Sequence, residues 1–222
     1  MPRLLYVSQL AGPEHPRRAV MDVERAEIPR VFSALGASVV VHDATAAPPP
    51  APHDFDGVVV GGSLGSANDA EPWRIALRDW LATHRDIDLF GICGGHQLLA
   101  VALGGTVEVA PNPQMGVYPL TLPGVPGHAG SVVQMHSDRV ASAPDGAEVW
   151  AVDAMGIQAL RYGPRRWTFQ FHPEIDRRLL EAAGTPIEDP RAWEGLDDAA
   201  RGGHALLRAW LDGVRGRLAA RA

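Results

Sequence analysis

The amino-acid sequence predicts an α/β fold in which an open, mostly parallel sheet carries helices on both faces. Short, almost continuously apolar runs alternate with helical patterns as far as residue 105, and this alternation is typical of parallel strands buried on both faces. Beyond that point strand patterns follow one another without intervening helices. We therefore expect the second half of the sheet to be rich in antiparallel strands.

The first half of the chain is predicted to contain four strands and three helices. The first helix includes Pro29, which can kink it, and ends at Gly36, a plausible C-cap. The proline- and alanine-rich run 47–52 is interpreted as a stiff surface loop. In chain order the expected elements are a strand over 4–7, a helix over 17–35, strands over 38–42 and 57–60, a helix over 71–84, a strand over 88–93 and a helix over 95–103.

The second half is predicted to consist of strands followed by a helical tail. From Asp176 onward the pattern is mostly helical, and one apolar stripe is typical of a helix packed on a sheet. Neither an internal repeat nor a break in composition is present, so residues 1–222 are expected to form a single domain. The strands are expected at 107–110, 116–122, 131–135, 149–152, 156–162 and 167–171, and the stripe consists of Leu206, Leu207, Trp210, Leu211 and Val214.

The charged residues exclude several classes of protein. The net charge is −6 and basic residues occur at most in pairs such as Arg165-Arg166, whereas nucleic-acid binding requires clustered cations. All 20 basic residues are arginine, so neither a Schiff-base lysine nor a lysine-containing phosphate loop is possible. No nucleic-acid partner is predicted.

The single cysteine excludes internal disulfides and cysteine-rich metal sites. The first ten residues lack a signal-peptide pattern, and no stretch approaches ~18 consecutive apolar residues. The chain is therefore expected to be cytoplasmic, without a membrane partner. Neither a metal nor an organic cofactor is predicted.

Cys93 is the candidate nucleophile. It lies between an apolar strand and a helix, with Gly91 before it and Gly94 and Gly95 after it. Small neighbours are needed where a nucleophile occupies a sharp strand-to-helix turn with strained backbone geometry. Such a turn exposes the sulfur at the carboxyl edge of the sheet, and the helix N-terminus favours negative charge there. The alternative is a buried cysteine that acts as a small hydrophobic residue.

A candidate base occurs about 80 residues later, in the segment Phe171-His172-Pro173-Glu174. A thiol nucleophile needs a base to take its proton, and the base needs a third group to fix its orientation. His172 and Glu174 are two residues apart, so their side chains lie on the same side of an extended segment. An exposed turn without a catalytic role is the alternative, but the cysteine motif upstream favours a base and its carboxylate.

The segments Gly91–Gln97 and Phe171–Glu174 together resemble the motifs of the class I (triad) glutamine amidotransferases, which have a flavodoxin-like fold. The wider stretch 57–174 is similar in particular to the amidotransferase domain of GMP synthetase and its stand-alone relatives. The resemblance implies that Cys93, His172 and Glu174 form a catalytic triad and that a γ-glutamyl thioester is the intermediate.

The resemblance also implies an oxyanion hole. Gly61-Gly62-Ser63 follows the strand over 57–60, and backbone N–H groups of such a turn can point at a developing oxyanion. By resemblance Gly62 supplies one donor and Gly94 the other. Many relatives have proline where this chain has Ser63, so the loop is expected to be set differently here. A glycine turn without a catalytic role is the alternative.

Substrate contacts are implied by two further matches. Gln97, one helical turn after the cysteine, matches a residue that lies against the amino-acid end of the substrate. The segment Met135-His136-Ser137-Asp138 is similar to a Ser-His-Gly-Asp segment that lines the glutamine pocket. Ser137 replaces the glycine of that pattern, where its side chain could narrow the pocket or contribute a hydroxyl group.

Three functions follow from these observations. The first is a glutaminase that releases ammonia and glutamate from glutamine and passes the ammonia to a separate synthetase subunit. The second is a stand-alone γ-glutamyl hydrolase or peptidase that uses the same triad on another γ-glutamyl compound. The third is a non-catalytic binding module, against which the intact cysteine, histidine and glutamate argue.

Overall fold

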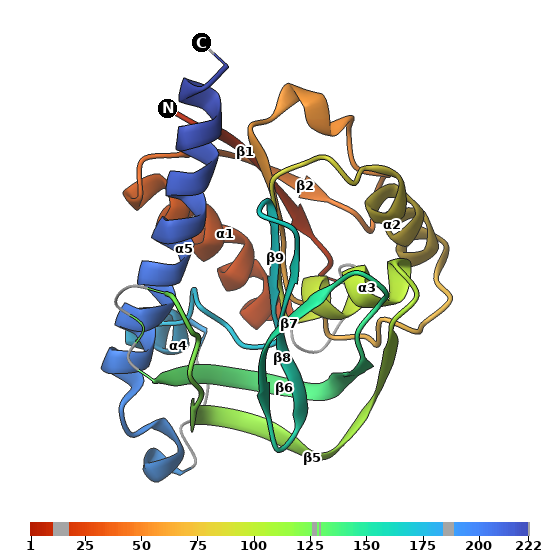
Figure 1. The fold of residues 1–222 in the computed structure, drawn as a ribbon. Helices are drawn as coiled ribbons and strands as arrows, with labels where there is room; N and C mark the ends of the chain where they lie inside the picture. Colours follow the sequence, from red (N-terminus) through yellow and green to blue (C-terminus); the bar gives the residue numbers. More distant parts are fainter. Residues whose placement is uncertain (11–17, 126–127, 129, 184–188, 222) are drawn as a thin grey trace.

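The computed structural model describes residues 1–10, 18–125, 128, 130–183 and 189–221 (Figure 1). The described elements follow the predicted order of strands and helices. They are β1 (Arg3–Ser8), α1 (Arg18–Ala34), β2 (Ser38–Asp43), the short 3₁₀ helix η1 (Pro52–Asp54), β3 (Gly57–Val60), α2 (Pro72–Thr83), β4 (Leu89–Ile92), α3 (Gly94–Ala102), β5 (Thr106–Pro119), β6 (Ser131–Ser142), β7 (Glu148–Asp153), β8 (Gly156–Tyr162), β9 (Arg166–Phe169), α4 (Arg177–Ala182), η2 (Pro190–Trp193) and α5 (Leu196–Ala219).

The described strands form one sheet in the order β2-β1-β3-β4-β9-β8-β6-β5, with β7 paired to β8. Neighbouring strands are parallel from β2 through β1, β3 and β4 to β9. The pairs β9–β8, β8–β6, β6–β5 and β7–β8 are antiparallel. The α/β class and the antiparallel second half are confirmed, but the description "mostly parallel" holds only for the first five strands of this order. The reason is that β5 to β9 follow one another without the crossover helices that parallel pairing requires.

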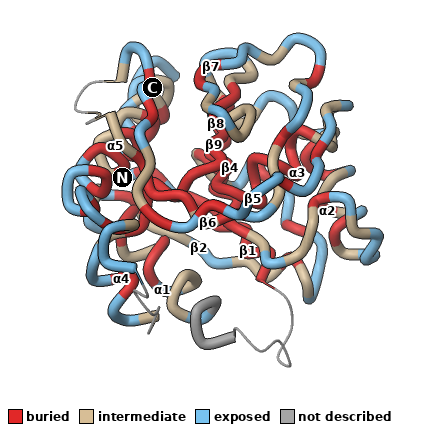
Figure 2. The backbone as a smooth tube through the Cα atoms, turned by 90° about the horizontal axis from the view of Figure 1, so that it is seen from below, coloured by how far each residue is buried: buried red, intermediate tan, exposed pale blue. Residues whose placement is uncertain are grey.

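Helices cover both faces of the parallel strands, as predicted (Figure 1). Side chains alternate along each strand, so Leu4 and Tyr6 of β1 pack with α1 and α5, whereas Leu5 and Val7 pack with α2 and α3. Figure 2 shows the result: the backbone is buried along the middle of the sheet and exposed on the outer sides of the helices. The parallel strands are thus fixed from both sides, which holds their carboxyl ends in place.

Helix α5 confirms the predicted apolar stripe. Its five residues are each at most 1% exposed, and Trp210 makes edge contacts with Phe32 and Phe90. Gly203 of the same helix lies against the backbone of Pro173, where a Cβ atom would collide with the proline carbonyl group. The helix therefore supports the segment that contains the candidate base.

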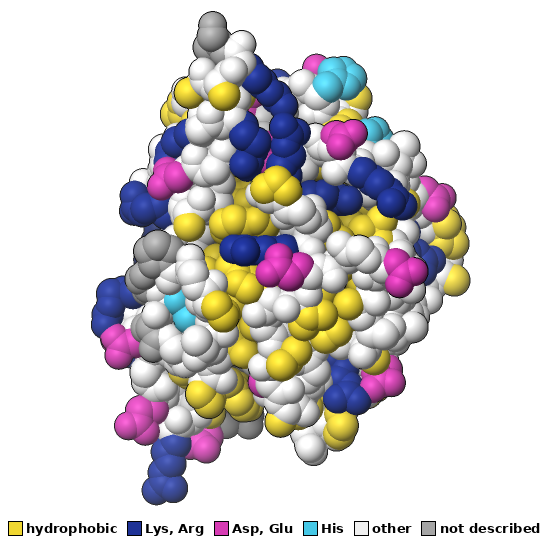
Figure 3. All heavy atoms as spheres, in the orientation of Figure 1, with side chains coloured by type: hydrophobic (Ala, Val, Ile, Leu, Met, Phe, Trp, Pro, Cys, Tyr) yellow, Lys and Arg dark blue, Asp and Glu magenta, His cyan; other side chains and the backbone are white. Residues whose placement is uncertain are grey.

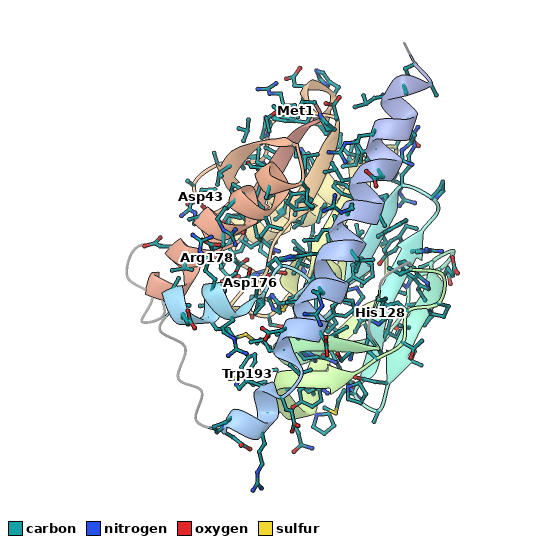
Figure 4. All side chains as sticks on the ribbon, turned by 90° about the vertical axis from the view of Figure 1, so that its left-hand side faces the viewer. Met1, Asp43, His128, Asp176, Arg178 and Trp193 are labelled. Carbon is teal, nitrogen blue, oxygen red and sulfur yellow. The ribbon has the colours of Figure 1, made fainter. Side chains whose placement is uncertain are left out.

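Helix α4 connects the segment that contains the candidate base, His172, to α1. Asp176 and Arg178, labelled in Figure 4, form ion pairs with Arg30 at 3.5 Å and with Glu27 at 3.6 Å, respectively. Asp176 is also the N-cap of α4, since its side chain accepts a hydrogen bond from the Leu179 amide at 2.8 Å. Because α4 follows directly after the candidate base, α1 is tied to the same part of the molecule.

Several element boundaries differ from prediction. Helix α1 continues through Pro29, and residue 17, where a helix was predicted to begin, lies outside the described residues. The two strands predicted at 107–110 and 116–122 form the single strand β5, whose register shifts between Val109 and Gln114. Prolines 111 and 113 lie at this shift, where they interrupt the strand pattern without ending the strand.

The antiparallel part of the molecule exposes several large apolar side chains. They lie on β5 and β7, and Figure 3 shows hydrophobic side chains interspersed with arginine and acidic residues on one face of the molecule. Scattered apolar residues of this kind are normal on protein surfaces. No helix among the described residues is long and apolar enough to cross a membrane.

Candidate active site

Cys93 lies in the predicted strand-to-helix turn, between β4 and α3. With φ of 47° and ψ of −101°, it is the single non-glycine residue of positive φ among those that the structure describes. Such a backbone conformation costs on the order of 1–3 kcal/mol, which the surrounding packing must offset. A Cβ atom at Gly95 would collide with the carbonyl oxygen of Val60, so the prediction that small neighbours are needed has a direct steric cause.

The Cys93 sulfur is buried among polar groups. Its residue is 6% exposed, and Gln170 Nε2 lies 3.7 Å from the sulfur. The carbonyl oxygen of Met135, in the antiparallel strand β6, lies 3.9 Å from the sulfur. The Cys93 amide donates to the Phe169 carbonyl oxygen at 2.8 Å, which joins the turn to β9. The sulfur is therefore located where β4, β6 and β9 meet.

His172 and Glu174 lie together, as the sequence predicts. His172 Nδ1 is 2.7 Å from Glu174 Oε1, and the residues are 8% and 1% exposed. The His172 amide donates to the Val133 carbonyl oxygen at 2.8 Å, so β6 also fixes this segment. An imidazole that donates from Nδ1 to a carboxylate presents Nε2 as its basic nitrogen.

The pKa of His172 reflects its partners. Burial by itself lowers the pKa, but the Glu174 carboxylate and the Cys93 sulfur raise it well above the ordinary value of 6.5. The direction of this shift thus depends on the glutamate and on the cysteine. The imidazolium form of His172 is stabilised, which is the form that protonates a leaving group.

Gly62 and Gly94 lie against each other beside the histidine. A Cβ atom at Gly94 would be 2.6 Å from the Ser63 nitrogen, and one at Gly62 would be 3.5 Å from Cε1 of His172. The two glycines predicted as oxyanion donors are thus brought together. The Gly62 N–H, however, already donates to a carboxylate oxygen of Glu24 at 3.2 Å.

Ser63 holds the glycine loop through its hydroxyl group. Ser63 Oγ accepts hydrogen bonds from Arg74 Nη1 at 3.1 Å and from the Gly65 amide at 3.3 Å. Arg74 is 2% exposed and is itself paired with Glu71 at 3.0 Å. A proline at this position could not accept these hydrogen bonds, so the loop depends on the serine hydroxyl group.

Gln97, His136 and Asp138 are brought together, but in part through backbone atoms. Gln97 Nε2 donates to the Asp138 carbonyl oxygen at 3.0 Å and to Gln170 Oε1 at 3.1 Å. His136 Nδ1 lies 2.9 Å from the same Asp138 oxygen. Ser137 is exposed, as expected from the alternation of side chains along β6.

Three polar groups at the candidate site were not predicted from the sequence. Gln170 links the sulfur to Gln97, and Glu24 reaches the glycine turn from α1. A third group supports His136, whose Nε2 lies 2.5 Å from Gln134 Oε1, while Gln134 Nε2 donates to Asp153 at 3.1 Å. Gln170 carried a signal, because it precedes the base by two residues and so shares its face of the strand.

His96 has a structural position next to the sheet. It is fully buried, and burial is the main cause that lowers its pKa to about 3. Its ring nitrogens lie 2.8 Å from Thr168 Oγ1 and 3.3 Å from the Ile157 carbonyl oxygen. Within the described residues, no group of three or more histidine, cysteine or acidic side chains is arranged to hold a metal ion.

The fold and this site define an α/β protein with a buried cysteine on a strand-to-helix turn and a histidine–glutamate pair beside it. The sequence pattern of the family described as glutamine amidotransferase class-I matches residues 20–183. The chain belongs to the class I glutamine amidotransferase family.

Individual relatives and solved structures agree with this family. The chain is 30% identical to γ-glutamyl peptidase 5 of Arabidopsis thaliana over 57% of this chain and 56% of that protein. It is 36% identical to the glutamine-hydrolysing GMP synthase of Xylella fastidiosa over 42% of this chain and 20% of that protein. The chain thus matches about half of the peptidase and a fifth of the synthase.

The fold is shared with a glutamine amidotransferase from Thermotoga maritima. The TM-score is 0.74 at 22% identity, over 96% of this chain and 97% of that one. A glutamine amidotransferase from Methylobacillus flagellatus gives a TM-score of 0.72 at 22% identity, over 96% of this chain and 94% of that one.

Proposed function

We propose that this protein hydrolyses the side-chain amide of glutamine through a γ-glutamyl thioester on Cys93, releasing ammonia and glutamate. The observation that carries the proposal is the 2.7 Å contact between His172 and Glu174 beside a cysteine in a strained turn. A buried cysteine with only a packing role needs neither an oriented base nor a positive φ.

The first half of the reaction forms the thioester. His172 Nε2 takes the proton of Cys93, and the sulfur attacks the δ-carbon of glutamine. The resulting oxyanion is stabilised by the Gly94 amide, one of the unpaired N–H groups at the start of α3, together with the Gly62 amide. The His172 imidazolium then protonates the nitrogen, and ammonia leaves as the carbon–nitrogen bond breaks.

The second half regenerates the enzyme. Neutral His172 takes a proton from water, the hydroxide attacks the thioester carbon, and a second oxyanion forms at the same donors. Collapse of this intermediate breaks the carbon–sulfur bond, releases glutamate and returns the proton to the sulfur. Glu174 holds the imidazole orientation throughout and stabilises its positive charge.

The substrate's amino-acid end is proposed to lie against Gln97, His136 and Asp138. Support comes from their closeness to the sulfur, since Gln170 bonds both the Gln97 amide and Cys93. Burial is the main cause that lowers the pKa of His136 to about 4, so this side chain is neutral at pH 7. Both of its ring nitrogens already contact protein oxygen atoms, of Asp138 and of Gln134, so its role in this proposal is to shape the pocket and to hold the Asp138 backbone.

Hydrolysis of another γ-glutamyl compound is the second candidate. The chain is similar to γ-glutamyl peptidase 5 over 143 residues, and this similarity favours the hydrolase. The similarity to a GMP synthase favours the glutaminase in the same way. Under the first function, ammonia passes to a separate synthetase subunit. Under the second, the γ-glutamyl group is cut from a peptide or amine and no ammonia acceptor is involved.

A substrate panel separates the two candidates. Purified protein is incubated with glutamine, γ-glutamyl peptides and γ-glutamyl amines, and glutamate release is measured. Turnover of glutamine supports the first function. Turnover of peptides or amines without any on glutamine rejects the ammonia donor and leaves the hydrolase.

Replacement of the nucleophile tests the mechanism itself. Cys93→Ala should reduce kcat on the best substrate by roughly 10³-fold or more, because no other group can form the thioester. Circular dichroism and the melting temperature should show a folded protein. A folded Cys93→Ala protein that retains its activity would remove Cys93 from the mechanism.

A further inference from the structure

Glu24 is a carboxylate at the candidate active site that the proposed mechanism does not use. One of its oxygens, Oε1, accepts the Gly62 N–H at 3.2 Å and the Tyr6 hydroxyl at 3.2 Å. A Cβ atom at Gly61 would lie 3.1 Å from this same oxygen, and one at Gly62 would lie 3.5 Å from it. The carboxylate is thus placed directly on the glycine turn.

The charges around Glu24 are unusual for a carboxylate. The groups that face it are Tyr6 from β1, the Gly62 amide after β3, and His172 and Glu174 after β9. Two arginines of α1 whose side chains the structure describes are engaged elsewhere, Arg25 with Asp43 at 2.9 Å and Arg30 with Glu27 and Asp176. Burial, followed by the repulsion of Glu174, raises the pKa of Glu24 above its ordinary value of 4.5.

This placement conflicts with oxyanion stabilisation at Gly62. An N–H that donates to Glu24 is not free for a substrate oxyanion, and an ionised carboxylate next to that donor repels a second negative charge. Substrate turnover therefore requires that the Glu24 carboxyl group rotates away or becomes neutral. The ion pairs between α1 and α4 hold the helix itself, so rotation of the side chain is the smaller movement.

We propose that Glu24 is a positioning residue that occupies the Gly62 amide in the resting enzyme and restrains oxyanion stabilisation until its carboxyl group is displaced or neutralised. The inference rests on the proposed function, in which Gly62 is an oxyanion donor. Tyr6 has a supporting role, because its hydroxyl group is the second donor that keeps the carboxylate on the turn.

A graded series of variants tests this role on the best γ-glutamyl substrate. Glu24→Ala should raise kcat roughly ten-fold with little change in KM, because the donor becomes free and the repelling charge is gone. Glu24→Gln should give a smaller rise, since the amide oxygen still accepts the Gly62 N–H without the charge. Tyr6→Phe should give the smallest rise. Glu181→Gln, the same change at an exposed glutamate on α4, is the matched control.

The pH profile distinguishes this role from a structural one. The kcat advantage of Glu24→Ala should shrink at acidic pH, where protonated Glu24 of the wild-type protein resembles the neutral side chain of Glu24→Gln, and should reach its full size once Glu24 is ionised. In parallel, the ¹⁵N resonance of the Gly62 amide should titrate with Glu24 in the wild-type protein and stop doing so in Glu24→Ala. A pH-independent effect, or a Gly62 resonance that does not titrate, refutes the proposal.

The remaining outcomes separate the two proposals. If the wild-type protein hydrolyses its substrate and a folded Glu24→Ala variant is equally fast or slower, the role of Glu24 is refuted while the proposed function stands. A slower variant with raised KM would make Glu24 a substrate contact. If neither protein hydrolyses any compound although iodoacetamide alkylates Cys93 in both, the proposed function fails and the role of Glu24 fails with it.

Discussion

The parallel and antiparallel halves of the sheet contribute to the candidate site in different ways. β3, β4 and β9 contribute at their carboxyl ends, where the glycine turn, Cys93 and His172 follow the last strand residues. β6 and β8 instead lie alongside the site, and β6 contacts it through the carbonyl groups of Val133, Met135 and Asp138. The first half places the side chains that we propose to react, while the second supplies a wall of backbone and a buried polar network.

This difference shows why the two halves tolerate different changes. A side chain at a strand end is replaced without disturbing the ladder, so its loss is expected to affect chemistry more than folding. The network of Gln134, His136 and Asp153 lies between strands, so its loss is expected to affect stability more than chemistry. The three predictions below test this contrast.

The largest effect is expected from Glu174→Gln, in the strand-end set. Removal of the carboxylate should lower kcat by roughly 10²–10⁴-fold, because the imidazole loses the partner that fixes its tautomer. It should also lower the pKa of His172, since Glu174 is the main cause that raises it. Steady-state kinetics and NMR titration of the His172 ring measure the two effects.

The control for this variant is Glu181→Gln, which changes an exposed glutamate on α4. It should leave kcat and the titration of His172 unchanged. A Glu174→Gln protein with near wild-type kcat and an unchanged titration of His172 would contradict the assignment.

An intermediate effect is expected from Asp153→Asn, in the antiparallel network. Asp153 accepts hydrogen bonds from Gln158 Nε2 at 2.9 Å, Gln134 Nε2 at 3.1 Å and the Met155 amide at 2.8 Å. The asparagine NH₂ group must face one of these donors, so the free energy of unfolding should fall by about 1–3 kcal/mol. Urea denaturation measures this loss. A kcat loss as large as that of Glu174→Gln would abolish the distinction between the halves.

The last prediction concerns His96, which contacts Thr168 on β9 and Ile157 on β8 and so bridges the two halves. The pKa of His96 is about 3 and that of His136 about 4, both below the ordinary value of 6.5. Between each lowered pKa and 6.5, the unfolded chain binds a proton that the folded chain does not bind. Stability should therefore decrease as the pH falls from about 6.5 to about 4, by at most about 1.4 kcal/mol per pH unit for each histidine.

In His96→Gln, which retains a donor for the Ile157 carbonyl group, this decrease should be shallower, because only His136 still contributes. Urea midpoints at pH 7, 6, 5 and 4 provide the comparison. Equal slopes in the two proteins would assign the acid sensitivity to other groups.

The sequence was sufficient for the parts of the molecule that local patterns determine. Apolar runs located the parallel strands, and the glycines around Cys93 predicted its turn because the backbone there leaves no room for side chains. The pairing of β4 with β9 then brings the cysteine and histidine motifs together across about 80 residues. The closeness of His172 to Glu174 followed from their spacing alone.

The parts that could not be predicted depend on tertiary contacts. Glu24 lies on an amphipathic helix, where a glutamate usually faces solvent, and only the approach of α1 to the glycine turn brings it into the site. The contact of buried Arg74 with Ser63 could not be predicted either, because it depends on how α2 packs. The contact of Gln97 with Asp138 could not be predicted either, because it is made to a backbone carbonyl group, which every residue type has.

The hydrogen bond between the Cys93 amide and the Phe169 carbonyl group has a consequence for motion. It places the candidate nucleophile and the strand that precedes the candidate base on neighbouring central strands, whose separation in any sheet is about 4.8 Å. The spacing between sulfur and imidazole is thus set within one rigid layer and not across a hinge. Opening and closing of the loops around the site would change access to this pair without changing the distance within it.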